Sequence, residues 1–321
     1  MEFSRRQVLA AGLATLGGAA TTAAQAQGYP NNVIRFVIPT PPGGGHDIMM
    51  RLVGQKLTER LGQPVIVESK PGATGAIAAQ TVARAAPDGY TLLLAYSAFL
   101  SNLLLMSKPG YRQEDFSTVG MLALTPIALG ISENLAASTL RQYVALAKTR
   151  PGQLAYASYG QGSGGHFVGE LFNVAAGIET IHVPYKGEAP ALQDVIGGQV
   201  QAVCASIGGT KRYPGRIRTL AVASAERSPS YPDVPTFAEL GYPGVDMPGW
   251  AALMAPAGTP KAVVDLLTKE VNEIVLLPDV KAKIAELGFD SVGWAPDRTH
   301  AFFKTQLASS EKLVRSGRVK L

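Results

Sequence analysis

Two glycine-rich turns, more than a hundred residues apart, constrain the fold of this chain most strongly. The first is Pro42-Gly43-Gly44-Gly45-His46-Asp47, and the second is Gly160-Gln161-Gly162-Ser163-Gly164-Gly165-His166. Each follows an apolar, strand-like run and opens an amphipathic stretch with helical spacing. Such a turn leaves several backbone N–H groups unpaired at a helix N-terminus, where the positive end of the helix dipole also lies. We therefore expect one anion to be held from two sides.

The segments around these turns alternate between strand-like and helix-like patterns. Apolar, β-branched runs predict strands at residues 33–38, 65–67, 91–95, 154–158, 181–183, 200–205 and 219–223. Amphipathic stretches follow most of them, and three proline-initiated helices are predicted at residues 260–276, 278–287 and 296–316. Such alternation is typical of parallel sheets covered by helices on both faces.

The order of these segments predicts an α/β fold of two lobes with a cleft between them. The chain would build one lobe, cross near residues 124–131, build a second lobe, and return near residues 248–255. The first lobe would comprise residues 27–126 and 250–321, and the second lobe residues 127–249. Both glycine-rich turns would then face the cleft from the carboxyl ends of strands, where open α/β sheets bind ligands.

The first residues predict an export signal that is separate from this fold. Arg5 and Arg6 form a twin arginine, an apolar stretch rich in Gly, Ala and Thr follows, and Ala24-Gln25-Ala26 is a small-x-small cleavage site. We interpret residues 1–26 as a Tat-type signal peptide, which predicts a periplasmic protein. A Sec signal and a short membrane anchor stay open as alternatives.

Composition argues against several other classes of protein. With 46% hydrophobic and 17% charged residues, the chain has the composition of a globular protein with a sizeable core. Its densest basic stretch, residues 211–218, has only Tyr213 as a stacking platform, so nucleic-acid binding is not expected. The four histidines have no paired spacing, so no metal is expected. The single cysteine, Cys204, predicts a buried free thiol.

The motifs taken together resemble the periplasmic receptors of tripartite tricarboxylate transporters, the Bug family. The family's pattern of a proline, two glycines, two variable residues and an aspartate matches Pro42 to Asp47. The similarity continues through Lys70-Pro71-Gly72-Ala73, Ala86-Pro87-Asp88-Gly89-Tyr90, Gly160-x-Gly162-Ser163-x-x-His166 and His182-Val183-Pro184-Tyr185-Lys186-Gly187. The resemblance implies a type II periplasmic binding-protein fold without catalysis or cofactor. It also implies a monomer that delivers a small carboxylate to a membrane permease, or to a sensor.

The resemblance also places the ligand on the two glycine-rich turns and the loops beside them. The predicted ligand-binding residues are Thr40, Gly44, Gly45, His46, Asp47, Ala73, Thr74, Ser97, Tyr159, Gly160, Gly162, Ser163, Gly164, His166, Ala205 and Ser206. Neither principal turn contains lysine or arginine, so we expect oriented N–H groups to hold the anion. This favours a small carboxylate over a multiply charged phosphate.

Several of these residues have a structural alternative. Ser163 and Asp47 either contact the ligand or cap their helices, and Thr74 either contacts the ligand or caps the helix that follows it. Ser97 matches a stretch that lines the cleft in the family. His166 either binds the ligand or braces the second turn.

Three departures from the family pattern bear on the identity of the ligand. His46 and Tyr159 stand where small residues are common in the family. Ala205-Ser206 stands where the family often has an acidic residue followed by Asn or Ser. These changes add rings to the cleft and remove a charge. We predict a bulkier or aromatic carboxylate that packs against Tyr159 or His46.

Two enzyme classes compete with this interpretation. Gly160-x-Gly162-x-x-Gly165 after a strand resembles a dinucleotide-binding fingerprint, which would suit an exported oxidoreductase. That fingerprint also needs an acidic residue at the end of the next strand, whereas Glu179 precedes that strand. A serine hydrolase would need glycine two residues before Ser163, but position 161 is glutamine.

Overall fold

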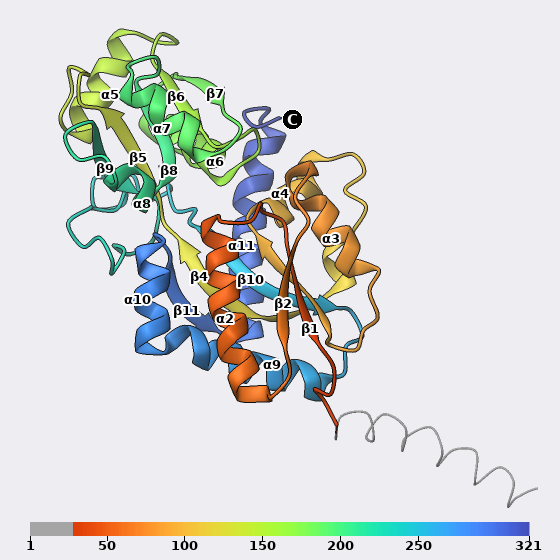
Figure 1. The fold of residues 1–321 in the computed structure, drawn as a ribbon. Helices are drawn as coiled ribbons and strands as arrows, with labels where there is room; N and C mark the ends of the chain where they lie inside the picture. The colour runs from red at the N-terminus through yellow and green to blue at the C-terminus, as the bar shows by residue number, and fades with distance from the viewer. Residues whose placement is uncertain (1–27, 321) are drawn as a thin grey trace, which may run out of the picture.

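The computed structural model describes residues 28–320, which form two α/β lobes (Figure 1). The sheet of the first lobe contains, side by side, β11 (Asp290–Trp294), β4 (Phe116–Thr125), β10 (Gly249–Pro256), β3 (Thr91–Tyr96), β1 (Ile34–Ile38) and β2 (Val65–Ser69). The sheet of the second lobe contains β7 (Ile181–Pro184), β6 (Ala155–Ser158), β8 (Ala202–Ser206), β5 (Ile127–Ser132) and β9 (Ile217–Val222). The predicted two-lobe fold is confirmed, and the predicted signal at residues 1–26 lies outside the described residues.

Helices pack on both sheets. Those that follow or cover strands of the first sheet are α2 (Gly45–Leu61), η1 (Ala73–Gly75), α3 (Ala76–Ala83), α4 (Ala98–Leu105), η2 (Gln113–Asp115), α9 (Lys261–Leu276), α10 (Pro278–Glu286) and α11 (Pro296–Arg315). Those of the second lobe are α5 (Leu140–Thr149), α6 (Gly164–Ala176), α7 (Glu188–Ile196) and α8 (Ile207–Lys211). Within the described range, no helix combines the length and the apolar character needed to cross a membrane.

Sequence patterns do not predict α4, α8 or β11. The first five residues of α4, Ala98 to Asn102, are all buried, so this helix has no polar face to give a helical period. α8 has only five residues. Every residue of β11 is half-buried, so its sequence shows no alternation.

The predicted parallel pairing is found in part of each sheet, and both sheets are mixed. β1 is parallel to β2 and β3, and β6 is parallel to β7 and β8. In contrast, β10 is antiparallel to β3 and β4, and β5 is antiparallel to β8 and β9. The chain enters the second lobe through β5 and returns to the first lobe through β10, so each of these strands begins at the side that faces the other lobe. The parallel strands of each sheet end at that side, so β5 and β10 run in the opposite direction. β4 ends at Thr125 and β5 begins at Ile127, which leaves Pro126 as the link between the sheets.

Helix α11 connects the two lobes a third time, and Figure 1 shows it running from β4 and β10 up to α6. In the first lobe, the ring of Phe303 lies 4.5 Å from that of Trp250. At the other end, Leu313 and Val319 are buried in the core of the second lobe, and Arg318 pairs with Glu170 of α6 at 3.2 Å. The final residues therefore pack with the second lobe, although the exact lobe boundaries stay a prediction.

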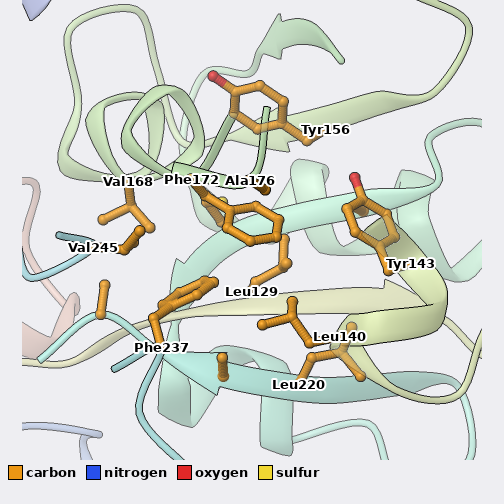
Figure 2. Packing of buried hydrophobic residues seen from close by; sticks show 14 of the residues in the cluster. Leu129, Leu140, Tyr143, Tyr156, Val168, Phe172, Ala176, Leu220, Phe237 and Val245 are labelled. Atoms are coloured by element: carbon orange, nitrogen blue, oxygen red, sulfur yellow. The ribbon is translucent and has the colours of Figure 1, made fainter. Parts of the chain in front are cut away.

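The core of the second lobe is formed by α5 and α6 on one face of its sheet. Figure 2 shows Phe172 of α6 beside Phe237, with their ring centroids 5.0 Å apart. The hydroxyl of buried Tyr156 donates to Glu170 at 2.9 Å, which satisfies the polar end of this ring. Cys204 is also buried there, and burial raises the pKa of its thiol. The packing holds β6 and α6, and hence the turn between them, in a fixed position.

Candidate functional site

The two glycine-rich turns lie at the carboxyl ends of strands in different lobes. The first follows β1 and begins α2, and the second follows β6 and begins α6. Ser101 of α4 donates from Oγ to the carbonyl of Gly162 at 3.1 Å, so the second turn contacts the first lobe. Ser228 and Ser230 also donate to Asp290 of β11, at 3.1 and 3.0 Å. The first of these hydrogen bonds joins the lobes at the second turn, and the other two join them at the start of β11.

The first turn presents several polar groups without partners. Among the described residues, no acceptor is found for the N–H groups of Gly44, Gly45, His46 and Asp47, which are the donors that a helix start leaves unpaired. Thr40 Oγ1 and His46 Nε2 are also buried without a described partner. Buried polar groups are normally hydrogen-bonded, so this cluster is suited to a ligand that accepts hydrogen bonds.

Asp47 fixes the shape of the first turn. Its Oδ2 accepts from the Gly43 N–H at 2.9 Å and from Arg51 Nε at 3.0 Å, and its Oδ1 lies 3.0 Å from an Arg51 amino group. The bond from Arg51 lowers the pKa of Asp47, and the Gly43 N–H adds to the effect. The geometry thus favours the capping alternative. Arg51, one helical turn further on, is a residue that the sequence analysis did not include.

His46 contributes a neutral ring beside these donors. Its ring centroid lies 5.1 Å from that of Phe289 and 5.9 Å from that of Tyr96. Burial lowers the pKa of His46 to about 4, so the imidazole is uncharged at neutral pH. A neutral imidazole has one N–H donor and one acceptor. His46 can therefore bind an oxygen without adding a charge.

The second turn, in contrast, satisfies most of its own N–H groups. Gly160 donates to Ser158 Oγ at 3.2 Å, Gly162 to His166 Nδ1 at 3.1 Å, and Ser163 to the Gly160 carbonyl at 3.2 Å. Ser163 Oγ accepts from the His166 N–H at 3.3 Å, so Ser163 is the N-cap of α6. The expected two-sided grip is therefore unequal, because fewer donors are free here than at α2.

His166 braces this turn together with His182, which the sequence analysis names in a motif but does not place in the site. Their rings stack with centroids 3.7 Å apart and planes 8° apart. His182 Nε2 is hydrogen-bonded to Ser158 Oγ at 2.7 Å. Burial lowers the pKa of His166 to about 3, with a further effect from His182, and burial lowers the pKa of His182 to about 4. The geometry favours the bracing alternative for His166.

Tyr159 covers the beginning of α6. A Cβ atom on Gly164 would lie 2.7 Å from the Tyr159 hydroxyl, and one on Gly165 would lie 2.3 Å from the backbone carbonyl oxygen of Cys204, so only glycine fits at position 165. The Gly165 N–H lies within hydrogen-bonding reach of this hydroxyl. Burial raises the pKa of Tyr159, which stays protonated. Tyr159 thus occupies the position where α6 would offer a donor to a ligand.

Ser206 and Glu188 lie at the same edge of the second sheet. Ser206 donates from its N–H and its Oγ to the two oxygens of Glu188, both at 2.8 Å, and its Oγ accepts from the Gly209 N–H at 3.0 Å. The side chain of Ala205 is fully buried in the core of the second lobe, so the predicted contact from Ala205 stays a prediction for its backbone alone. Glu188 thus places an acidic side chain beside Ser206.

The remaining predicted residues lie in the loops that follow β2 and β3. Ser97 borders a small cavity of about 20 Å³ between the lobes, together with Ser101 and Gly162. A larger surface groove, about 570 Å³, lies beside α5 and contains none of the predicted site residues. Ala73 and Thr74 have left-handed backbone, with φ of 46° and 51°. Gly75 is the N-cap of α3, so Thr74 does not cap that helix.

Replacing Thr74 by glycine is expected to raise the free energy of unfolding. A β-branched residue at positive φ carries strain of about 1–3 kcal/mol, whereas glycine adopts this conformation freely. Glycine also loses more conformational entropy on folding than threonine, which offsets part of the relieved strain. The free energy of unfolding should therefore rise by about 1 kcal/mol. Urea unfolding measures it, with Thr305→Gly in regular helix α11 as the control that should lose about 0.5 kcal/mol. A loss of stability in Thr74→Gly would contradict this account.

Comparison with known proteins identifies the family. A family model described as "Tripartite tricarboxylate transporter family receptor" matches residues 49–318. The chain belongs to this family. The resemblance inferred from the motifs is confirmed. BugT of Bordetella pertussis is 37% identical over 314 residues, which cover 96% of each chain. Members of the family are periplasmic solute-binding receptors.

Solved structures of receptors from the same family share the two-lobe fold. Rpa4515 of R. palustris with adipate has a TM-score of 0.80 and 31% identity, over 91% of this chain and 99% of that one. MatC of Rhodopseudomonas palustris with bound malate has a TM-score of 0.76 and 30% identity, over 89% of this chain and 100% of that one. Each of these two receptors is thus described with a small dicarboxylate.

Proposed function

We propose that this chain is an extracytoplasmic receptor that captures a small carboxylate between its lobes and delivers it to the permease of a tripartite tricarboxylate-type transporter. The observation that carries the proposal is the group of four unpaired N–H groups at the start of α2, beside the unpartnered Thr40 Oγ1 and His46 Nε2. A carboxylate has two oxygens with about four acceptor positions, which matches this set of donors. The adipate and malate named with two related structures support the same ligand class.

The residues of the second turn support binding rather than catalysis. Ser163 Oγ caps α6, and His166 Nδ1 accepts from the Gly162 N–H, so neither is arranged as a nucleophile and its base. The dinucleotide alternative also lacks its acidic residue, because β7 ends at Pro184 and Glu179 precedes this strand. Among residues 28–320, no group of three or more His, Cys, Asp and Glu side chains is placed to hold a metal.

Closure of the lobes provides the signal that a permease can recognise. A ligand shifts a protein toward the closed state by as much as its affinity for that state exceeds its affinity for the open one. The hydrogen bonds from Ser101 to Gly162 and from Ser228 and Ser230 to Asp290 join the two lobes in this structure. The proposal includes export to the periplasm through the signal at residues 1–26, and a monomeric receptor.

Thermal unfolding of the chain from residue 27 onward, against a ligand panel, tests the proposed function. The panel contains aliphatic and aromatic mono- and dicarboxylates, tricarboxylates, amino acids and nicotinamide cofactors. A ligand at a thousandfold excess over its Kd stabilises the folded protein by about 4 kcal/mol, which is easily measured. A shift restricted to carboxylates supports the proposal. A shift with a nicotinamide cofactor alone would favour the oxidoreductase.

A further inference from the structure

We propose that the cleft selects monocarboxylates over dicarboxylates, and that Tyr159 and Glu188 are the residues that exclude a second carboxylate. This inference rests on the proposed function, the capture of a carboxylate between the lobes. It concerns which carboxylates the cleft accepts, and it follows from the unequal chemistry of the two turns.

The first turn is built for one carboxylate. Its four unpaired N–H groups and the buried Thr40 hydroxyl can satisfy two ligand oxygens. Asp47, the acid of this turn, is already paired with Arg51 and with the Gly43 N–H, so it does not oppose an incoming anion as a free charge. One negative charge is thus well accommodated at α2.

The second turn has little to offer another anion. The N–H groups of Gly160, Gly162, Ser163 and His166 are all bonded within the turn or to the strand before it. The Tyr159 hydroxyl lies over Gly164 and faces the Gly165 N–H. A second carboxylate would have to displace this ring to reach the Gly165 N–H, and it would lose its water while most other N–H groups of the turn stay bonded elsewhere.

An acidic side chain at the same edge adds electrostatic repulsion. The strands β6, β7 and β8 are parallel neighbours, so the residues after their carboxyl ends lie together. Tyr159 follows β6 and Glu188 follows β7, while Ser206 at the end of β8 donates twice to Glu188. Glu188 also acts electrostatically on Tyr159. Burial raises the pKa of Glu188, whereas the two hydrogen bonds from Ser206 and the nearby exposed Arg212 favour its charged form. Like charges brought together in a partly buried site oppose binding.

The groups that remain around the first turn suit an uncharged ligand body. His46 is neutral and packs between Tyr96 and Phe289, and Tyr159 presents its ring from the other lobe. None of these four rings carries a charge at neutral pH. The apolar or aromatic body of a ligand would therefore bury its surface against these rings, and no charged group of the protein or of the ligand body would be left unpaired.

Two matched pairs of acids test the proposal by calorimetry with the chain from residue 27 onward. Hexanoate and adipate differ by one terminal carboxylate, and so do benzoate and terephthalate. We expect the monocarboxylate of at least one pair to bind, and to bind about tenfold or more tightly than its dicarboxylate. A dicarboxylate that binds as tightly as its partner, or more tightly, would overturn this inference and leave the proposed function standing. No binding of any carboxylate would remove both.

Two variants separate the roles of the ring and the charge. Tyr159→Ser should reduce the preference for the monocarboxylate about tenfold, since it uncovers the Gly165 N–H, and Glu188→Gln should reduce it about threefold by removing the repulsion. Tyr213→Ser, in the same lobe but outside both turns, is the control and should keep the natural preference. Because Glu188→Gln keeps the shape of the side chain and one of its two acceptor oxygens near Ser206, it tests the proposal even if Tyr159→Ser does not fold. An unchanged preference in the folded variants would contradict the assignment.

Discussion

A Gly44→Val protein is expected to fold normally and to bind its carboxylate at least about 100-fold more weakly, a loss of about 2.7 kcal/mol. Gly44 has φ of −78° and ψ of 165°, an extended backbone that valine adopts readily. A Cβ atom there would contact only the Pro41 carbonyl oxygen, at 3.6 Å, so the fold gives no steric objection. The side chain would, however, stand beside the unpaired N–H groups of α2 and obstruct the approach of ligand oxygens. Calorimetry gives the affinity, and urea unfolding shows that stability is kept.

Gly244→Val is the matched control for this experiment. Gly244 is exposed and has no described neighbour within 4 Å of its Cβ position, so both affinity and stability should stay unchanged. Gly162 is a poorer position for the test, because its φ of 67° would strain the backbone of a valine there. A loss of binding in that variant could not be separated from a loss of folding. If Gly44→Val bound with natural affinity, the ligand would not lie on the start of α2.

The sequence predicted the two-lobe fold because its strong signals are local. The apolar runs at β1, β3 and β8 and the glycine turns after β1 and β6 can be identified from neighbouring residues alone. The antiparallel course of β5 and β10 could not, because it depends on which lobe each strand enters. The same limit applies to α11, whose last residues, Leu313 and Val319, pack with the second lobe far from its start.

The site was predictable in its location but not in the use of its hydrogen bonds. Both turns can be found from glycine spacing, yet that spacing does not reveal that the turn at α6 satisfies most of its own N–H groups, while the turn at α2 leaves four without an acceptor among the described residues. Ser163 and Asp47 have the residue types of both a cap and a ligand contact, and only the geometry favours capping. His182 and Glu188 were missed because each acts on a turn that is distant in sequence.

Stability is expected to fall steeply as the pH drops from 6.5 toward 5, because three histidines are buried in the uncharged form. Burial lowers the pKa to about 4 for His46, about 3 for His166 and about 4 for His182, compared with about 6.5 in the unfolded chain. Between these values the unfolded state binds more protons than the folded state, so acid favours unfolding. Each histidine contributes up to about 1.4 kcal/mol per pH unit in this window.

The difference between the natural chain and His182→Gln isolates one of these contributions. Glutamine keeps a hydrogen-bonding group near Ser158 but does not titrate, so the slope of unfolding free energy between pH 6 and 5 should fall by about 1 kcal/mol per pH unit. Desolvation raises the pKa values of Glu188 and Asp246, which act in the opposite direction, but both residues are present in both proteins and cancel in the difference. The lowered pKa values of Asp47 and Asp115 matter only below this window, since their stabilisation is lost as the pH falls below their ordinary range. Urea unfolding at pH 7, 6 and 5 measures both slopes, and equal slopes would show that His182 is not buried in its neutral form.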